Sequence, residues 1–352
     1  MTAGTHGDVA PAGAVPPNVP PPTVAPVEGL TSLPAWVSDM ADALALRLRD
    51  LVVPHLGQAA ARALAGRAAG GDTTFAVDEV AEAFVEQFLS MQGRPVAVYS
   101  EDRGYREWHG PAEYALIIDP IDGTRPALAG FEAACVSIAV ARMAERPTMA
   151  DVLYGVIVEI KEGGVFRAAR GRGVDICTAG GKRLTPAISV NTDLSRLFWT
   201  IGFRGRPAVE LVAVLGGLID RSSVDGAVFD IGSATYSMTR LLTGQLDAYV
   251  DVGPLMIERA PWVEARFREV GKGHVLNNSP YDVAASTLML REAGCVVTDA
   301  GGRSLDDRPL LGSDMHYQMS VVASANPDLH EAILAEVAAG MHAFVAGGIG
   351  GL

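Results

Sequence analysis

Two aspartates, Asp119 and Asp122, stand three residues apart in the stretch IIDPIDGT, directly after an apolar run that is typical of a buried strand. Between them, Pro120 fixes its own φ and favours an extended backbone at the residue before it. We therefore expect the chain to leave the strand in a turn at this point. Such a turn lets both carboxylates and the carbonyl oxygen of Ile121 point inward together, as a metal site requires.

Ligands made only of oxygen suit a hard cation, and Mg²⁺ typically takes one or two carboxylates, waters and phosphate oxygens. Glu101 ends the preceding apolar run, PVAVYSE, and strands that end at one sheet edge bring their last side chains together. Crowded carboxylates raise each other's pKa, so a bound cation is the simplest reason to gather them. Behind the pair, Gly123 and Thr124 are expected to start a helix whose free backbone N–H groups bind a phosphate.

These features resemble the inositol monophosphatase family, the Mg²⁺-dependent, lithium-sensitive sugar-phosphatase superfamily that also includes archaeal-type fructose-1,6-bisphosphatases. The matching segments occur in the family's order: GGDTTFAVDEVAE (70–82), YSED (99–102), IIDPIDGT (117–124), VSIAVA (136–141), IGSATYSMTRLLTGQLDAYVD (231–251) and YDVAASTLMLREAGC (281–295). The Asp-x-Asp-Gly-Thr motif of haloacid-dehalogenase-type phosphatases is similar, but its aspartates are two residues apart instead of three.

The resemblance implies a role for each matching position. The implied metal ligands are Glu101, Asp119, the carbonyl of Ile121, Asp122 and Asp282. The implied catalytic residues are Glu101, Thr124 and Asp78, and the implied phosphate-binding residues are Gly123 and Thr124. The implied contacts to substrate hydroxyls are Gly232, Ser233, Ala234 and Asp251.

The activity that the resemblance implies is Mg²⁺-dependent hydrolysis of a phosphomonoester by direct attack of water, with two or three bound ions and inhibition by Li⁺. The implied substrate is a small phosphorylated polyol, sugar or nucleoside, and the implied assembly is a homodimer. Fructose-1,6-bisphosphatase and 3′-phosphoadenosine phosphatase activities are alternatives. A non-catalytic regulator that binds a phosphorylated metabolite is the alternative from another class, although every expected ligand type is present in the sequence.

Each residue also has a simpler interpretation. A lone Asp-Pro or Asp-Gly is usually a turn, and an isolated acidic residue is usually a solvated surface group. Asp78 suits a cap at the start of the helix DEVAEAF, a role that is compatible with catalysis, and Asp251 suits the end of a strand. Three arginines could reach a second phosphate, but surface ion pairs are the favoured interpretation for Arg204, Arg206 and Arg259.

Alternating helices and strands must position these side chains, and the resemblance implies an αβαβα sandwich, an α/β layered fold. Helical periodicity is found at residues 36–69 with a break at Pro54, and at 78–91, 209–220, 233–244, 283–295 and 329–341. Apolar runs typical of strands are found at residues 95–101, 114–119, 134–143, 152–160, 163–171, 196–203, 246–252 and 318–327. We expect sub-domains at residues 35–188 and 189–340, a disordered Pro-rich tail at 1–34 and a flexible tail at 341–352.

Composition narrows the class of protein further. The net charge of −13 and the absence of a basic block argue against a nucleic-acid surface. Three widely spaced cysteines predict reduced thiols in a cytoplasmic protein. The N-terminus lacks the pattern of a signal peptide, and no run of 18 apolar residues predicts a membrane span. Residues 254–280 make a long connection that we expect beside the substrate pocket.

Overall fold

The computed structural model describes residues 33–347. All but the last two residues of the predicted Pro-rich tail therefore lie outside the described residues. The α-helices are α1 (Ala35–Val52), α2 (Ala76–Ser90), α3 (Thr124–Ala129), α4 (Ala208–Arg221), α5 (Ala234–Leu242), α6 (Gly253–Arg259), α7 (Glu264–Val270), α8 (Pro280–Glu292) and α9 (Pro327–Gly347). The short 3₁₀ helices are η1 (Val53–His55), η2 (Ala59–Arg62), η3 (Met149–Asp151), η4 (Leu194–Arg196) and η5 (Pro261–Val263).

The strands form two main sheets and one hairpin within the described chain. The hairpin pairs β1 (Leu64–Arg67) with β2 (Thr73–Phe75). The larger sheet has the order β10-β9-β8-β7-β6-β5-β3-β4, and the smaller one has the order β12-β11-β13-β15-β14. The strands of the larger sheet are β3 (Val96–Ser100), β4 (Gly104–Trp108), β5 (Tyr114–Asp122), β6 (Cys135–Arg142), β7 (Val152–Glu159), β8 (Val165–Ala169), β9 (Val174–Cys177) and β10 (Arg183–Leu184). Those of the smaller sheet are β11 (Phe198–Ile201), β12 (Ala227–Phe229), β13 (Ala248–Asp251), β14 (Val296–Thr298) and β15 (Val321–Ser324).

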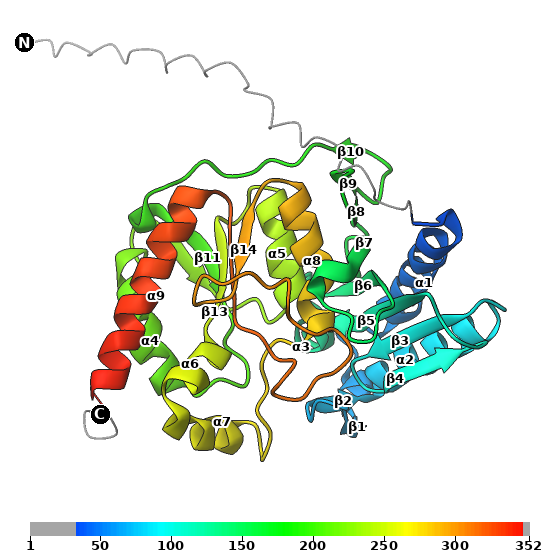
Figure 1. Ribbon diagram of the computed structural model, residues 1–352, viewed down its shortest axis with the longest axis horizontal. Coiled ribbons are helices and arrows are strands. Elements are labelled where there is room, and N and C mark those ends of the chain that lie inside the picture. Colours follow the sequence, from blue (N-terminus) through cyan, green and yellow to red (C-terminus); the bar gives the residue numbers. More distant parts are fainter. Residues whose placement is uncertain (1–32, 348–352) are drawn as a thin grey trace, which may run out of the picture.

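Helices and sheets alternate in five layers (Figure 1). Helices α1 and α2 cover the outer face of the larger sheet, α5 and α8 lie between the two sheets, and α4 and α9 cover the outer face of the smaller sheet. The apolar spacing of each helix explains its place. In α1, for example, the buried residues recur every three or four positions and form one stripe. The layered α/β fold predicted from the sequence is confirmed.

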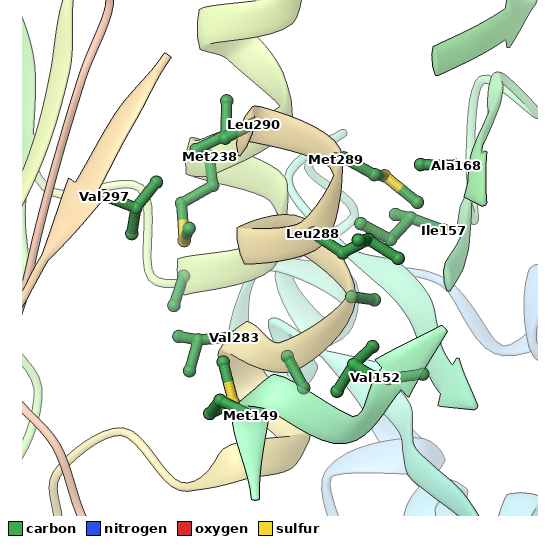
Figure 2. Close-up of a cluster of buried hydrophobic side chains, with 14 of the residues drawn as sticks. Met149, Val152, Ile157, Ala168, Met238, Val283, Leu288, Met289, Leu290 and Val297 are labelled. Atoms are coloured by element: carbon green, nitrogen blue, oxygen red, sulfur yellow. The ribbon is translucent and has the colours of Figure 1, made fainter. Parts of the chain in front are cut away.

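Helix α8 is buried on nearly every side because it lies between two sheets. Figure 2 shows Leu288 and Met289 directed toward Ile157 and Ala168 of the larger sheet, whereas Leu290 points toward Met238 of α5 and Val297 of β14. Ten of its thirteen residues are buried, so its position is set by packing in two directions. This rigid placement matters because Asp282 lies in its first turn.

The structure differs from the sequence prediction at both ends of the described chain. Residues 36–69 were predicted to be helical throughout, but α1 ends before Pro54 and the segment finishes in strand β1. The break at Pro54 is confirmed; the long helix beyond it is wrong, because the chain there forms only the short η2 and then pairs with β2 through residues 64–67. Residues 341–347 were assigned to a flexible tail, yet they continue α9, where Met341 and Phe344 are buried.

By length and composition, α9 could cross a membrane, and it is the one helix in the described residues that passes this test. Its apolar positions Leu329, Ile333 and Val337 are buried against the smaller sheet and α4. Burial of a regular apolar stripe is the pattern of a packed helix in a layered core.

The larger sheet is built from residues up to 184 and the smaller sheet from residues after 197. The predicted boundary at residues 188 and 189 falls in the connection between them. However, α5 and α8 come from the second half of the chain and pack on strands of the first. The two halves share one core layer, and the division into sub-domains stays a prediction.

Candidate active site and metal centre

Three carboxylates from two distant parts of the chain meet between the sheets. Asp119 and Asp122 lie at the end of β5, and Asp282 lies in the first turn of α8. One oxygen from each carboxylate lies within 4.8 Å of the others, which is close enough for all three to hold one cation. Asp119 and Asp122 are buried, and Asp282 is partly exposed. The convergence of these three predicted ligands is a plain feature of the structure.

The end of β5 is a bulged strand, and not the turn that we predicted. Asp119 pairs with Ser137 and Asp122 pairs with Cys135 of β6, so β5 carries an extra residue between them. A bulge re-aims side chains and accommodates a proline, which lacks the N–H of a regular ladder. The backbone N–H of Ile121 donates to Oδ1 of Asp119 at 2.9 Å. The bulge therefore produces the inward carboxylates that we had expected from a turn.

Helix α5 connects the two acidic segments. Its capping residue Ser233 donates to Oδ2 of Asp122 at 2.7 Å, and the backbone N–H of Thr235 donates to the same oxygen at 2.6 Å. The hydroxyl of Thr235 donates to the carbonyl oxygen of Asp282. Ser233 was predicted only as a contact to substrate hydroxyls, and no role was predicted for Thr235. The available signal was the helix start itself, where exposed N–H groups attract a carboxylate.

Glu101 lies just after β3, beside the cluster but outside the group of three carboxylates. Burial raises the pKa of Glu101 well above its usual value, and the charge of Asp119 adds to this. The electrostatic effect indicates that Glu101 and Asp119 are neighbours. Its role as a ligand stays a prediction.

Thr124 and Asp78 contact each other as the resemblance implied. The hydroxyl of Thr124 lies 3.2 Å from Oδ1 of Asp78 and 3.0 Å from the carbonyl oxygen of Ile121. A hydroxyl has one proton, so it donates to one of these acceptors at a time. Asp78 also accepts from the backbone N–H of Phe75 at the start of α2. Both roles weighed for Asp78, helix capping and support of Thr124, are therefore compatible in the structure.

A cavity opens beside the cluster. It is lined by residues from both acidic segments and from the second half of the chain: Asp122, Ile201, Gly202, Phe203, Arg204, Arg206, Asp230, Gly232, Ser233, Ala234, Ser237, Tyr249, Asn278 and Asp282. The predicted substrate residues Gly232, Ser233 and Ala234 are among them.

Asp251, a predicted contact to substrate hydroxyls, lies outside the cavity lining. Its side chain is fully buried and forms an ion pair with Arg206, whose Nε donates to Oδ1 of Asp251 at 3.3 Å. The backbone N–H of Gly253 donates to the same oxygen. Asp251 ends strand β13 and is absent from the residues that line the cavity. Its carboxylate is occupied by Arg206 and Gly253, and its role as a substrate contact stays a prediction.

Arg206 departs from the favoured prediction of a surface ion pair, because its pair with Asp251 is buried. Arg206 is buried and also donates to the carbonyl oxygen of Leu276, so it ties the 254–280 connection to the turn before α4. Arg204 lines the cavity and forms an ion pair with Asp72. Arg259 pairs with Glu258 at the surface, with its side chain 61% exposed, as predicted.

Comparison with known proteins agrees with this geometry. Residues 37–342 match the family model described as the inositol monophosphatase family. The chain belongs to this family. One relative is the fructose-1,6-bisphosphatase/inositol-1-monophosphatase of Methanothermobacter thermautotrophicus. It is 26% identical to this chain over 297 residues, which is 83% of this chain and 92% of that protein. The inositol-1-monophosphatase of Aeropyrum pernix is 28% identical over 240 residues, 68% of this chain and 77% of that protein.

A solved structure confirms the family's fold independently. The Thermotoga maritima IMPase has a TM-score of 0.62 to this structure at 19% identity, covering 88% of this chain and 99% of that one. At such low identity, the likeness supports the shared αβαβα arrangement alone.

The acidic cluster fits the Mg²⁺ on which the inositol monophosphatase family generally depends. Burial raises the pKa of Asp119 and of Asp122, and it raises the pKa of Asp282 to about 8, helped by the charge of Asp122. Hydrogen bonds from Ser233 and Thr235 oppose the shift at Asp122. Buried acids with raised pKa values hold protons at neutral pH unless a cation replaces them, and an all-oxygen donor set favours a hard cation.

The turn that follows Asp122 depends on Gly123. This residue has φ of 92°, and a Cβ placed on it would lie 2.4 Å from the carbonyl oxygen of Ala133. Gly130 provides a matched position, because its φ is 81° but a Cβ there would approach nothing closer than 3.5 Å.

We expect Gly123→Ala to lower the free energy of unfolding by about 3 kcal/mol or more and to impair any activity of the site, because strain and a backbone clash add together. Gly130→Ala is expected to cost about 1–2 kcal/mol, since it meets the backbone strain alone. Urea unfolding of both variants measures the difference. Equal costs at the two positions would show that the close approach to Ala133 is not limiting.

Proposed function

We propose that this protein is a Mg²⁺-dependent phosphomonoesterase that hydrolyses a small phosphorylated polyol, sugar or nucleoside. The observation that carries the proposal is the convergence of Asp119, Asp122 and Asp282, with oxygens within 4.8 Å of one another, beside a cavity lined by polar groups. Membership of the inositol monophosphatase family supports the same reaction, phosphoric monoester hydrolysis.

Asp119, Asp122, Asp282, Glu101 and the carbonyl of Ile121 would hold the ions. Bound Mg²⁺ supplies a Lewis acid that lowers the pKa of water and neutralises charge on phosphoryl oxygens. Ser233 and Thr235 keep the carboxylate of Asp122 in one orientation. The backbone N–H groups of Gly123 and Thr124 are proposed to bind the phosphoryl oxygens at the start of α3.

The pair of Thr124 and Asp78 is proposed to position the attacking water. When the hydroxyl of Thr124 donates to Asp78, its lone pairs are free to accept a hydrogen bond from that water. Burial raises the pKa of Asp78 to about 7, which suits a group that exchanges a proton near neutral pH. Glu101, beside the cluster, is the proposed partner that accepts the proton of the water.

Substrate hydroxyls are proposed to contact Gly232, Ser233 and Ala234 at the start of α5. Asp230 and Asn278 line the same cavity and add an acceptor and a donor. Asn278 follows α6 and α7, the two short helices of the 254–280 connection. This placement supports the expectation that the connection borders the substrate pocket.

Finer properties are carried over from the family as proposals. They are binding of two or three Mg²⁺ ions, inhibition by Li⁺, assembly as a homodimer and a cytoplasmic location. The net charge of −13 supports the expectation that nucleic acid is not a partner. The packing of α9 in the core supports the expectation that the protein does not span a membrane.

A substrate panel tests the proposed function. We expect release of inorganic phosphate from at least one of inositol 1-phosphate, fructose 1,6-bisphosphate and 3′-phosphoadenosine 5′-phosphate, and we expect the release to require Mg²⁺. Fructose 1,6-bisphosphate is included because the Methanothermobacter relative carries both activities in its name. Binding of Mg²⁺ and of these esters without any turnover would favour the non-catalytic regulator. The ratio of kcat/KM values ranks the substrates.

A further inference from the structure

Two arginines, Arg204 and Arg206, line the cavity beside the acidic cluster. Arg204 lies in the turn between β11 and α4, and its side chain lines the same cavity as Asp122 and Asp282. The side chain is 39% exposed, so it is accessible from the cavity and is not locked inside the core. Its neighbour Arg206, by contrast, is committed to Asp251 and to a backbone carbonyl.

Asp72 holds Arg204 in place. Nη1 of Arg204 donates to Oδ2 of Asp72, which lies between strands β1 and β2. The other oxygen of Asp72 accepts from Thr73 at 2.7 Å and from Arg125 at 3.2 Å. Burial alone would raise the pKa of Asp72, but the charges of Arg204 and Arg125 outweigh it and lower that pKa. The bond to Asp72 uses one of the five guanidinium N–H groups of Arg204, and the others can serve a ligand.

The charge of Arg204 acts at short range on the proposed metal ligands. Burial alone would lower the pKa of Arg204, but the carboxylates of Asp72, Glu101 and Asp282 raise it. In return, Arg204 lowers the pKa of Asp122 and Asp282 against the effect of burial. The geometry agrees, because Arg204 lines the same cavity as Asp122 and Asp282 and its charge therefore acts beside that cluster. A phosphoryl group bound at the cluster would therefore lie nearer to Arg204 than an anionic group at the far end of a sugar substrate.

We propose that Arg204 is a catalytic residue that donates hydrogen bonds to the scissile phosphoryl group, and that Asp72 is the positioning residue that aims it. The proposal rests on the proposed phosphatase function. In that reaction a bond forms between the water oxygen and phosphorus, and the bond from phosphorus to the ester oxygen breaks. Arg204 keeps all its protons and stabilises negative charge on the phosphoryl oxygens, for which a guanidinium is well shaped.

The first test compares Arg204→Gln and Arg204→Lys with Arg259→Gln, a control that removes an exposed guanidinium outside the cavity lining. With wild-type kcat/KM as reference, Arg204→Gln is expected to lose roughly 10²–10³-fold on both inositol 1-phosphate and fructose 1,6-bisphosphate. Arg204→Lys should recover part of the loss, and Arg259→Gln should lose nothing. A loss confined to fructose 1,6-bisphosphate would overturn the proposal, because Arg204 would then bind a remote anionic group.

The second test measures binding without turnover. By calorimetry, Arg204→Gln should weaken inorganic phosphate binding at saturating Mg²⁺ by about 10-fold or more, yet bind Mg²⁺ more tightly than wild type. The opposite signs follow because removal of a cation takes away an attraction for phosphate and a repulsion of the metal. Weakening of both ligands together would indicate a structural role and contradict the proposal.

Asp72→Asn tests the positioning role. It should lower kcat/KM by roughly 10-fold, and the double variant Asp72→Asn with Arg204→Gln should be no worse than Arg204→Gln alone, because the two residues act as a unit. Additive losses would show that Asp72 does not act through Arg204. Failure of the proposed function looks different: the wild-type protein would release no phosphate from any substrate, whereas phosphate binding and its dependence on Arg204 remain measurable.

Discussion

Replacing Asp122 with asparagine is expected to lower kcat/KM by at least about 10³-fold while the protein stays folded. Asp122 ends β5, and its carboxylate accepts hydrogen bonds from Ser233 and Thr235 at the start of α5. It therefore connects the two elements. The asparagine oxygen can still accept from Ser233 and Thr235. Loss of one buried charge also relieves repulsion with Asp119 and Asp282, so the melting temperature should stay the same or rise.

Phosphate release and thermal unfolding, measured on the same preparation, check this expectation. Asp220→Asn is the matched control, because Asp220 is exposed near the end of α4 and far from the cluster in sequence. It should leave both quantities unchanged. Full activity of Asp122→Asn would remove Asp122 from the set of ligands, and an unfolded Asp122→Asn would mean that its role is structural.

Removal of divalent cations is expected to abolish activity and to make stability depend on pH. Burial raises the pKa of Asp282 to about 8 and that of Asp78 to about 7. Their usual value of 3.8 applies in the unfolded chain, so the folded protein binds more protons between about pH 4 and pH 8. The free energy of unfolding of the metal-free protein should therefore fall as the pH rises through this range.

Mg²⁺ should reverse this trend, because a cation replaces the protons of the cluster. At 100 times its Kd, a ligand that binds only the folded state adds about 2.7 kcal/mol to the free energy of unfolding. Urea unfolding at several pH values, with EDTA or with Mg²⁺, measures both effects. We expect Mg²⁺ to stabilise Asp119→Asn much less than wild type. Equal stability with and without Mg²⁺ at pH 8 would argue against a metal site at these carboxylates.

The candidate site was predictable where local chemistry dominates. Asp119, Asp122 and Asp282 each occur in a short motif, and the resemblance of these motifs to the inositol monophosphatase family implied that they would meet. The contact between Thr124 and Asp78 was predicted in the same way. The layered fold was also predictable, because helices and strands alternate with clear apolar periods.

Other features escaped prediction because they depend on pairing between segments. The residues of β1 do not alternate between apolar and polar types, and they form a strand only because β2 pairs with them. The extra residue in β5 is defined by its register against β6, which a single strand does not encode.

The site shows both what the residue types determined and what depended on the folded chain. The residue types and their spacing predicted that carboxylate oxygens suited to a hard cation gather at the end of β5. Only the folded chain decided that Asp251 turns to Arg206 while Arg204 turns to the cavity. Arginine and aspartate are long or flexible enough to pair with many partners. The close approach of Gly202 to Asp251 and the hydrogen bond from Arg206 to the 254–280 connection hold the Asp251–Arg206 pair in place.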